Sequence, residues 1–361
     1  MSDRSCLGKA ADATCAASSV DGQSTAGLAR RRVLAGLSAL ATTALPMGLA
    51  RGAAPSGVGS DWPARPVRIV VQYAAGGSTD TLARLLAEAL SPRLGQPVIV
   101  ENRAGAGGII GTDAVAKSAA DGHTLLLTVP GPIAANLVLY KRLPYDPRTD
   151  LRMVSDIATP RTVLVVHPSV EARDFAGLIE TIRARPGRFA MGSWGAGTQP
   201  HQIQVFMDKR YGLQTLHVAY KGEAPMALDL VAGTVQMTVG STATLVPHIQ
   251  AGRLRALAMA GSTRAQVLSE VSTFAEQGFN DEVYALTGPI SLMAPARVPD
   301  AVIERLGRET QAALQEPALR ARIAALGAEP IGNLPQEAAE NYRRFLPVSM
   351  RLVEATGVRL D

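Results

Sequence analysis

The chain has few cysteines and few aromatic residues. Its two cysteines, Cys6 and Cys15, both lie close to the start, so no thiol remains beyond residue 15. This absence excludes a disulfide-stapled scaffold, a cysteine nucleophile and a cysteine-ligated zinc site from the rest of the chain. Aromatic residues make up 4% of the sequence, and two tryptophans, Trp62 and Trp194, are too few for an aromatic binding stripe.

The chain also lacks a strong excess of either charge. It carries 36 Lys and Arg residues against 31 Asp and Glu residues. The first fifty residues hold five and three of these, which leaves 31 against 28, a net charge of +3 for the remainder. So small and scattered an excess does not predict a nucleic-acid surface, and we expect no nucleic-acid partner. A small anionic ligand is compatible with it.

No long hydrophobic run is present, but residues 1–54 differ from the rest of the chain. A polar stretch precedes Arg30-Arg31-Arg32-Val33-Leu34, and a weakly apolar run then continues to Ala50. This order is typical of a cleaved export signal of the twin-arginine type, with general secretion as the alternative. A membrane anchor competes with both, but the run is near the lower length limit and contains Pro46. We therefore predict a cleaved signal and linker over residues 1–54 and a periplasmic mature protein.

Beyond that segment, apolar β-rich runs alternate with helical patterns, which predicts an α/β fold with parallel strands. Strands are expected at 67–71, 98–101, 124–129, 163–166, 189–192, 216–218, 235–239, 256–260 and 290–294. Helices are expected at 81–90, 109–118, 175–184, 201–211, 225–232, 244–251, 299–314, 317–326 and 335–356. The length and order predict two lobes, 61–161 with 285–361 and 162–284, joined by at least two crossings.

Two glycine-rich loops, 76–80 and 193–198, each follow an expected strand and open an expected helix. Exposed N–H groups and the helix dipole at such a turn favour an anionic group, and glycine allows it to approach the backbone. Ligands of parallel sheets bind beyond the carboxyl ends of the strands, so we expect the loops to face each other across a cleft. Asp80 is placed to cap its helix, to contact the ligand, or to do both.

Sharper catalytic motifs are incomplete. Ser193 and His201 leave open an exported serine hydrolase, but the flanking Met191 and Gly195 give only half of a nucleophile elbow, and no acidic third member stands out. The glycines of 105–111 miss the spacing of a dinucleotide site, and the five histidines form no zinc-type pair. We expect no catalytic residue, no cofactor and no metal.

Eight segments together indicate a family: WPARPVR at 62–68, AGGSTDTLAR at 75–84, GQPVIVENRAGAGGIIGTDAVAKSAADGHTLLL at 95–127, LPYDP at 143–147, GSWGAGTQPH at 192–201, HVAYKG at 217–222, AGRLRALAMAGSTR at 251–264 and APARVP at 294–299. With them the chain resembles the Bug-type extracytoplasmic receptors of tripartite tricarboxylate transporters, which are TctC-like. The resemblance implies a type II periplasmic-binding-protein fold with a two-strand hinge. It also implies a monomeric receptor that passes a small organic carboxylate to the large and small integral membrane subunits of a transporter. A sensor in place of the permease is a third possibility.

The resemblance further implies how the ligand is held. Family members typically bind a carboxylate through backbone N–H groups, small hydroxyls and bridging waters instead of an arginine clamp. Carried onto this sequence, it implies contacts from Tyr73, Ala75, Gly77, Ser78, Thr79 and Asp80 in the first lobe, from Thr128 and Gly131 on the floor, and from Ser193, Gly197, Thr198 and His201 on the opposite wall.

The sequence departs from the family pattern at three places. Gln72 stands where a proline is usual, Val239-Gly240 where an aromatic residue and an Asp often occur, and Leu286-Thr287 where a Trp-containing segment is common. An Asp at 240 resembles a contact for an amino group of the ligand. Its absence favours a mono- or dicarboxylate without an amine.

Overall fold

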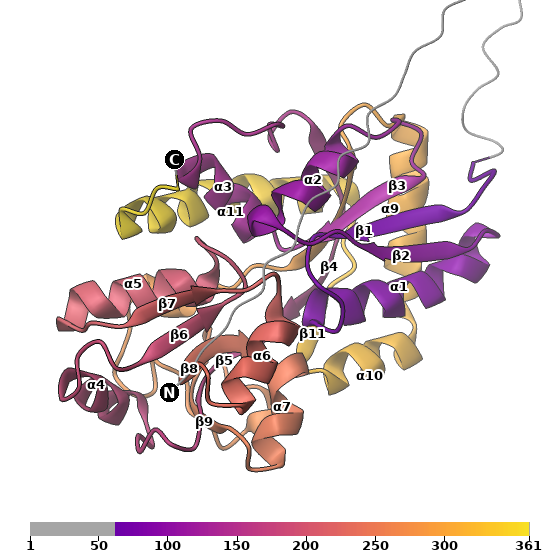
Figure 1. Cartoon of the computed structure of the whole chain (residues 1–361). Coiled ribbons are helices and arrows are strands. Elements are labelled where there is room, and N and C mark those ends of the chain that lie inside the picture. The colour runs from indigo at the N-terminus through magenta and orange to yellow at the C-terminus, as the bar shows by residue number, and fades with distance from the viewer. Residues whose placement is uncertain (1–61, 361) are drawn as a thin grey trace, which may run out of the picture. The chain divides into compact units, whose positions relative to one another are not determined.

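The computed structural model describes residues 62–360, so the predicted export signal at 1–54 lies outside the described residues. Two β-sheets form the framework, and helices cover both faces of each (Figure 1). A six-stranded sheet has the order β11-β4-β10-β3-β1-β2, and a five-stranded sheet has the order β7-β6-β8-β5-β9. We call the first sheet with its helices lobe 1 and the second lobe 2. The predicted α/β fold is confirmed.

Lobe 1 takes its elements from both ends of the described chain. Its strands are β1 (Val67–Val71), β2 (Val98–Asn102), β3 (Thr124–Thr128), β4 (Leu151–Pro160), β10 (Ile290–Pro295) and β11 (Ala328–Pro330). Its helices are α1 (Ser78–Leu94), the 3-10 turn η1 (Ala106–Gly108), α2 (Ile109–Ala116), α3 (Pro130–Leu139), α9 (Asp300–Gln315), α10 (Pro317–Ala325) and α11 (Pro335–Thr356).

Lobe 2 is continuous in sequence. Its strands are β5 (Thr162–Val166), β6 (Ala190–Ser193), β7 (Leu216–Ala219), β8 (Met237–Ser241) and β9 (Arg255–Ala260). Its helices are α4 (Phe175–Arg183), α5 (Gln199–Tyr211), α6 (Glu223–Val231), α7 (Thr242–Gln250), the 3-10 turn η2 (Gln266–Leu268) and α8 (Glu282–Ala285).

The inner strands β1 and β5 have buried apolar residues on both sides, as expected for sheets covered by helices. In β1, Ile69 and Val71 enter one hydrophobic core of lobe 1 and Val70 enters the other. In β5, Leu164 and Val165 divide in the same way between the two cores of lobe 2. This period of two fixes the register of each strand, because a shift by one residue would exchange the two faces.

Four elements of lobe 1 were not predicted from the sequence: the short η1 and β11, and the longer α3 and β4. Helix α3 is buried along almost its whole length and apolar on all sides, so it has no amphipathic period to reveal it. Strand β4 carries Ser155 and Asp156 in its middle, which interrupts its apolar pattern. Both polar residues are buried and hydrogen-bonded, Asp156 to three side chains from elsewhere in lobe 1.

The chain crosses between the lobes at two places that lie close together, since Arg161 and Thr287 both approach Gly261. Arg161 joins β4 to β5, and its N–H donates to Gly327 O at 3.3 Å. Residues 286–289 lead from α8 back to β10. The expected two-strand connection is therefore present.

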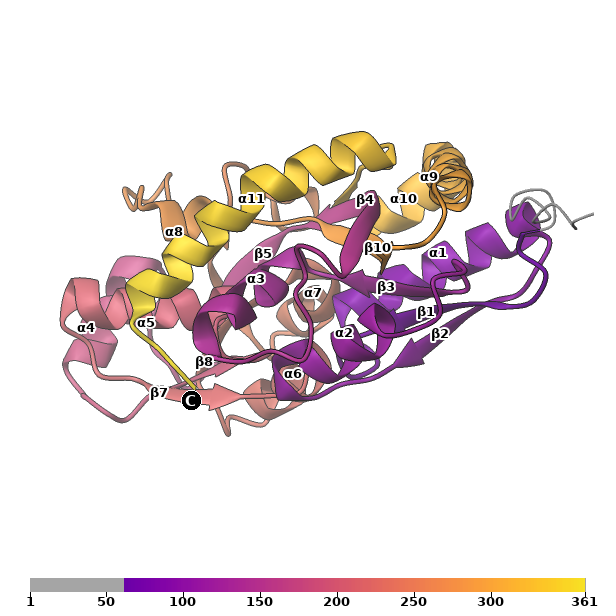
Figure 2. The same ribbon diagram turned by 90° about the horizontal axis from the view of Figure 1, so that it is seen from above.

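Helix α11 also bridges the lobes, since it runs over α3 and reaches α5 and α8 (Figure 2). Arg351 of α11 forms an ion pair with Glu282 of α8 at 2.9 Å. Lys209 Nζ of α5 donates to the terminal carbonyls of α11, Ala355 O at 2.9 Å and Thr356 O at 2.8 Å. None of the helices among residues 62–360 is long and apolar enough to cross a membrane.

The lobes touch on both sides of the space between them. On one side, Ala74 N–H donates to Lys221 O at 3.0 Å. On the other, a Cβ added to Gly197 would lie 2.7 Å from Ala135 Cβ of α3, so the close approach requires glycine at this left-handed position with φ +71°. The two lobes are therefore in direct contact at both places.

Candidate ligand-binding cleft

The space between the lobes is a cleft of about 850 Å³, including its open mouth. The first turns or cap residues of five helices line it, α1 and α3 from lobe 1 and α5, α6 and α7 from lobe 2. Each helix follows the carboxyl end of a strand or the turn after it, so the sheet topology itself directs these N-termini at the cleft. The first N–H groups of a helix have no partner inside it and carry a partial positive charge, which favours an anion.

Among residues 62–360, the walls are built from small, polar and apolar side chains and two carboxylates, Asp80 and Glu223, with no lysine or arginine. The lining residues are Tyr73, Ala74, Gly77, Ser78, Thr79, Asp80, Val129, Gly131, Pro132, Pro160, Thr162, Trp194, Gly197, Thr198, Gln199, Gln202, Glu223, Ser241, Leu286, Thr287, Gly288, Phe345 and Ser349.

The structure brings eight of the twelve expected site residues to the cleft wall. These are Tyr73, Gly77, Ser78, Thr79, Asp80, Gly131, Gly197 and Thr198. Direct contact with a ligand stays a prediction for each of them.

The other four expected residues lie away from the cleft wall. Ala75 is exposed and is not among the lining residues. Thr128 is buried in the sheet, at the end of β3 where it pairs with Ser291 of β10. Ser193 and His201 are buried behind the loop that bears Gly197, where His201 Nδ1 accepts the Gly197 N–H at 2.9 Å. Their position supports the loop instead of facing the cavity.

The hydrolase alternative finds no support in this geometry. Ser193 Oγ is fully buried, and its histidine partner is His217 Nε2 at 2.7 Å, not His201. The Nδ1 atom of His201 is occupied by a backbone N–H. Within residues 62–360, no group of three or more His, Cys, Asp or Glu side chains is placed to hold a metal ion.

Hydrogen bonds to its carboxylate fix Asp80 at the start of α1. Its carboxylate accepts two hydrogen bonds from Arg84, at 3.0 Å each, and one each from Gly76 N–H and Asn102 Nδ2, both at 3.0 Å. Burial alone would raise the pKa of Asp80, but these bonds from Arg84, Gly76 and Asn102 outweigh it and hold the pKa below its ordinary value. Asp80 is therefore ionised, and the charge of Arg84 neutralises it. The same hydrogen bonds fix the glycine loop before α1.

Several lining residues could not be found from the sequence. Thr162 and Thr287 come from the two lobe crossings, and Phe345 and Ser349 come from α11. Thr162 Oγ1 is buried and has no hydrogen-bond partner among the described residues, so it is a free polar group at the cleft. The sequence carries no signal for these four residues, because they come from segments far apart in the chain and only the folding of both lobes brings them together. Glu223, at the start of α6, was also missed.

The stacked rings of His201 and His217, 3.9 Å apart, make stability depend on pH. Burial and then the charge of His217 lower the pKa of His201 from 6.5 to about 4, and burial also lowers the pKa of His217. The unfolded chain therefore takes up these protons first, so the stabilisation is complete above pH 6.5 and is lost as the pH falls toward 4.

We expect the His201 contribution to this loss to be about 2 kcal/mol, measured by urea denaturation between about pH 7 and pH 4.5. His201→Asn keeps an acceptor near the Gly197 N–H but cannot take up a proton. It should flatten the pH dependence over this range. An unchanged slope in the variant would contradict the assignment.

Two α/β lobes joined by two crossings, with opposed helix N-termini around a cleft, define a type II periplasmic binding protein. The family model described as "Tripartite tricarboxylate transporter family receptor" matches residues 82–357. The chain belongs to this family of solute receptors, and the resemblance found in the sequence is confirmed.

Individual relatives agree with this assignment. Protein BugT of Bordetella pertussis is 38% identical over 304 residues, covering 83% of this chain and 91% of BugT. An R. palustris protein solved with adipate is 33% identical, with a TM-score of 0.79 over 83% of this chain and 100% of that one. The structure of the periplasmic binding protein BugD is 29% identical, with a TM-score of 0.78 over 83% of this chain and 100% of that one.

Proposed function

We propose that the protein is a periplasmic receptor that binds a small organic carboxylate between its lobes and passes it to the membrane subunits of a tripartite transporter. One observation carries the choice of ligand: helix N-termini from both lobes meet at a cleft that none of the described lysine or arginine residues lines. Such a site holds an anion through backbone N–H groups, hydroxyls and bridging waters. The adipate-bound relative supports a carboxylate, as does MatC from Rhodopseudomonas palustris, solved with malate and 26% identical.

In this proposal the ligand acts as the link between two moving bodies, residues 61–161 with 285–361 and residues 162–284. A carboxylate that contacts α1 and α5 at once binds the closed form better than the open form and shifts the equilibrium toward closure. The closed form is what the large and small membrane subunits recognise. The receptor works as a monomer, performs no catalysis, and reaches the periplasm by a cleaved N-terminal signal.

The test is a thermal-shift comparison of small acids with their own amides. At about 100 times its Kd, a ligand stabilises the folded state by about 2.7 kcal/mol, so the best acid should raise the melting temperature by about 5 °C or more. The matched amide keeps the skeleton but lacks the charge, so it should produce a much smaller shift. Equal shifts from acid and amide, or no shift from any acid, would contradict a carboxylate receptor.

A further inference from the structure

Glu223 brings a negative charge into the cleft from lobe 2. Its side chain is 7% exposed and lines the cleft. Across the lobe interface, Ser78 N–H at the start of α1 donates to Glu223 Oε2 at 3.3 Å. Within lobe 2, Oε2 also accepts Ser241 Oγ at 2.8 Å and Thr244 Oγ1 at 2.9 Å, and Oε1 accepts the Ser241 N–H. The carboxylate thus lies between the N-termini of α1 and α7.

The backbone before Glu223 holds this position. Lys221 O accepts the Ala74 N–H, and the next residue, Gly222, has φ +149°. A Cβ added at Gly222 would lie 3.0 Å from Ala74 N, so a side chain there would push the lobes apart. Because the glycine allows contact, Glu223 begins α6 directly against the start of α1.

Within the part of the chain that the structure describes, no cationic side chain is bonded to this carboxylate. All four hydrogen bonds that it accepts from described residues come from neutral donors, and no described lysine or arginine lines the cleft. Asp80, the other carboxylate at the cleft, is bonded to Arg84. Glu223 therefore supplies the uncompensated charge of the cleft wall.

The hydrogen-bond count at Glu223 leaves room for a ligand donor. A carboxylate offers about four acceptor positions, two on each oxygen. Oε2 already takes three donors, whereas Oε1 takes only the Ser241 N–H. One of the two acceptor positions on Oε1 therefore has no donor among the described residues, and a ligand N–H or O–H can fill it. A second ionised carboxylate there would instead face a like charge in a buried setting, which disfavours the charged form.

We propose that Glu223 determines specificity by favouring small acids with an ammonium group beside the carboxylate and by rejecting those with another carboxylate at that place. This inference rests on the proposed function, since it assumes that the acid binds in the cleft. It also reverses the preference for an amine-free acid that was based on Gly240. A Cβ on Gly240 would lie 3.2 Å from Glu223 Oε1, so a carboxylate reaches this place from position 223 instead.

The test measures affinities by titration calorimetry within matched triplets: aspartate, malate and succinate; glutamate, 2-hydroxyglutarate and glutarate; phenylalanine, phenyllactate and phenylpropionate. For the triplet that binds best, wild type should bind the amino acid at least about tenfold more tightly than the unsubstituted acid. Glu223→Gln should reduce this preference to below about threefold. Because each ratio compares two ligands on one protein, a loss of folded protein cancels.

Glu171→Gln is the control, since it removes the same charge from a lobe 2 side chain that is 84% exposed, and it should leave the ratio unchanged. Glu223→Ala repeats the test without a new amide group. The proposal is overturned if wild type shows no preference for the amino acid, or if the Glu223 variants keep the wild-type ratio. If no acid of any triplet binds wild type or variant, the proposed function fails as well, a result distinct from binding without discrimination.

Discussion

Replacing Ser78 with tryptophan is expected to weaken the binding of a small acid by at least about 100-fold. Ser78 is the first residue of α1, lines the cleft and donates its N–H across to Glu223. An indole ring at this place would fill the space between α1 and lobe 2 and would keep the lobes from closing on a ligand. The measurement is titration calorimetry with the acid that raises the melting temperature most.

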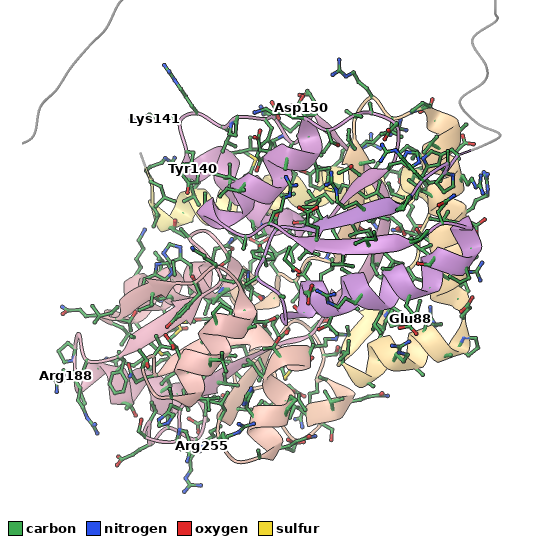
Figure 3. All side chains as sticks on the ribbon, turned by 45° about the vertical axis from the view of Figure 1, so that its right-hand side comes forward. Glu88, Tyr140, Lys141, Asp150, Arg188 and Arg255 are labelled. Atoms are coloured by element: carbon green, nitrogen blue, oxygen red, sulfur yellow. The ribbon has the colours of Figure 1, made fainter. Side chains whose placement is uncertain are left out.

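Glu88→Trp provides the matched control on the same helix. Glu88 lies on the side of α1 that faces α10 (Figure 3) and is not among the cleft-lining residues. Its side chain is 64% exposed, and its ion pair with Arg322 is a surface contact worth little. This variant should bind as wild type does. If Ser78→Trp also kept an affinity within about threefold of wild type, the cleft would not be the binding site.

The second large effect is expected on stability, from Asp156→Ala in the middle of β4. The Asp156 side chain is 1% exposed and accepts hydrogen bonds from Ser291 Oγ at 2.7 Å, Asn333 Nδ2 at 2.9 Å and Asn341 Nδ2 at 3.0 Å. These partners come from β10, the segment before α11 and α11 itself. Removal of the acceptor leaves three donors unpaired, each at a cost of about 1–3 kcal/mol, so we expect a total loss of about 4 kcal/mol in urea denaturation.

Asp156→Asn separates hydrogen bonding from size. The amide oxygen of the introduced asparagine would keep one acceptor, but the NH2 group that replaces the other oxygen would face a hydrogen-bond donor. The loss of unfolding free energy in Asp156→Asn should therefore be smaller than in Asp156→Ala, about 2 kcal/mol. A loss below about 1 kcal/mol in Asp156→Ala would show that this cluster does not hold β4, β10 and α11 together.

The elements that the sequence predicts best are those whose pattern repeats locally. The strand at 67–71 agrees with β1, and the helix at 335–356 agrees with α11, because alternating and helical apolar patterns mark them directly. Helix α3 was not predicted, because a helix that is buried on almost every side has no amphipathic period and resembles any buried segment. Strand β4 was not predicted, because Asp156 interrupts its apolar pattern and the hydrogen-bond partners of that carboxylate come together only in the folded chain.

The candidate site divides in the same way. Ser78 and Thr198 could be predicted because glycine loops between a strand and a helix have a known physical role at anions. Glu223 could not, since its place in the cleft depends on contact between Gly222 and Ala74, which are far apart in the chain. For Ser193 and His201 the sequence contains no indication of side-chain direction: both are polar and close to a glycine loop, yet their hydrogen bonds hold them behind the cleft wall, and contact with a ligand stays a prediction.

The most direct test of the central claim is a crystal structure of the protein with the acid that raises its melting temperature most. We predict that the carboxylate lies between the lobes, with its oxygens within about 3.2 Å of N–H groups at the start of α1 and of at least one helix of lobe 2. A carboxylate that contacts one lobe alone, or that is held outside the cleft by lysine or arginine side chains, would contradict the account.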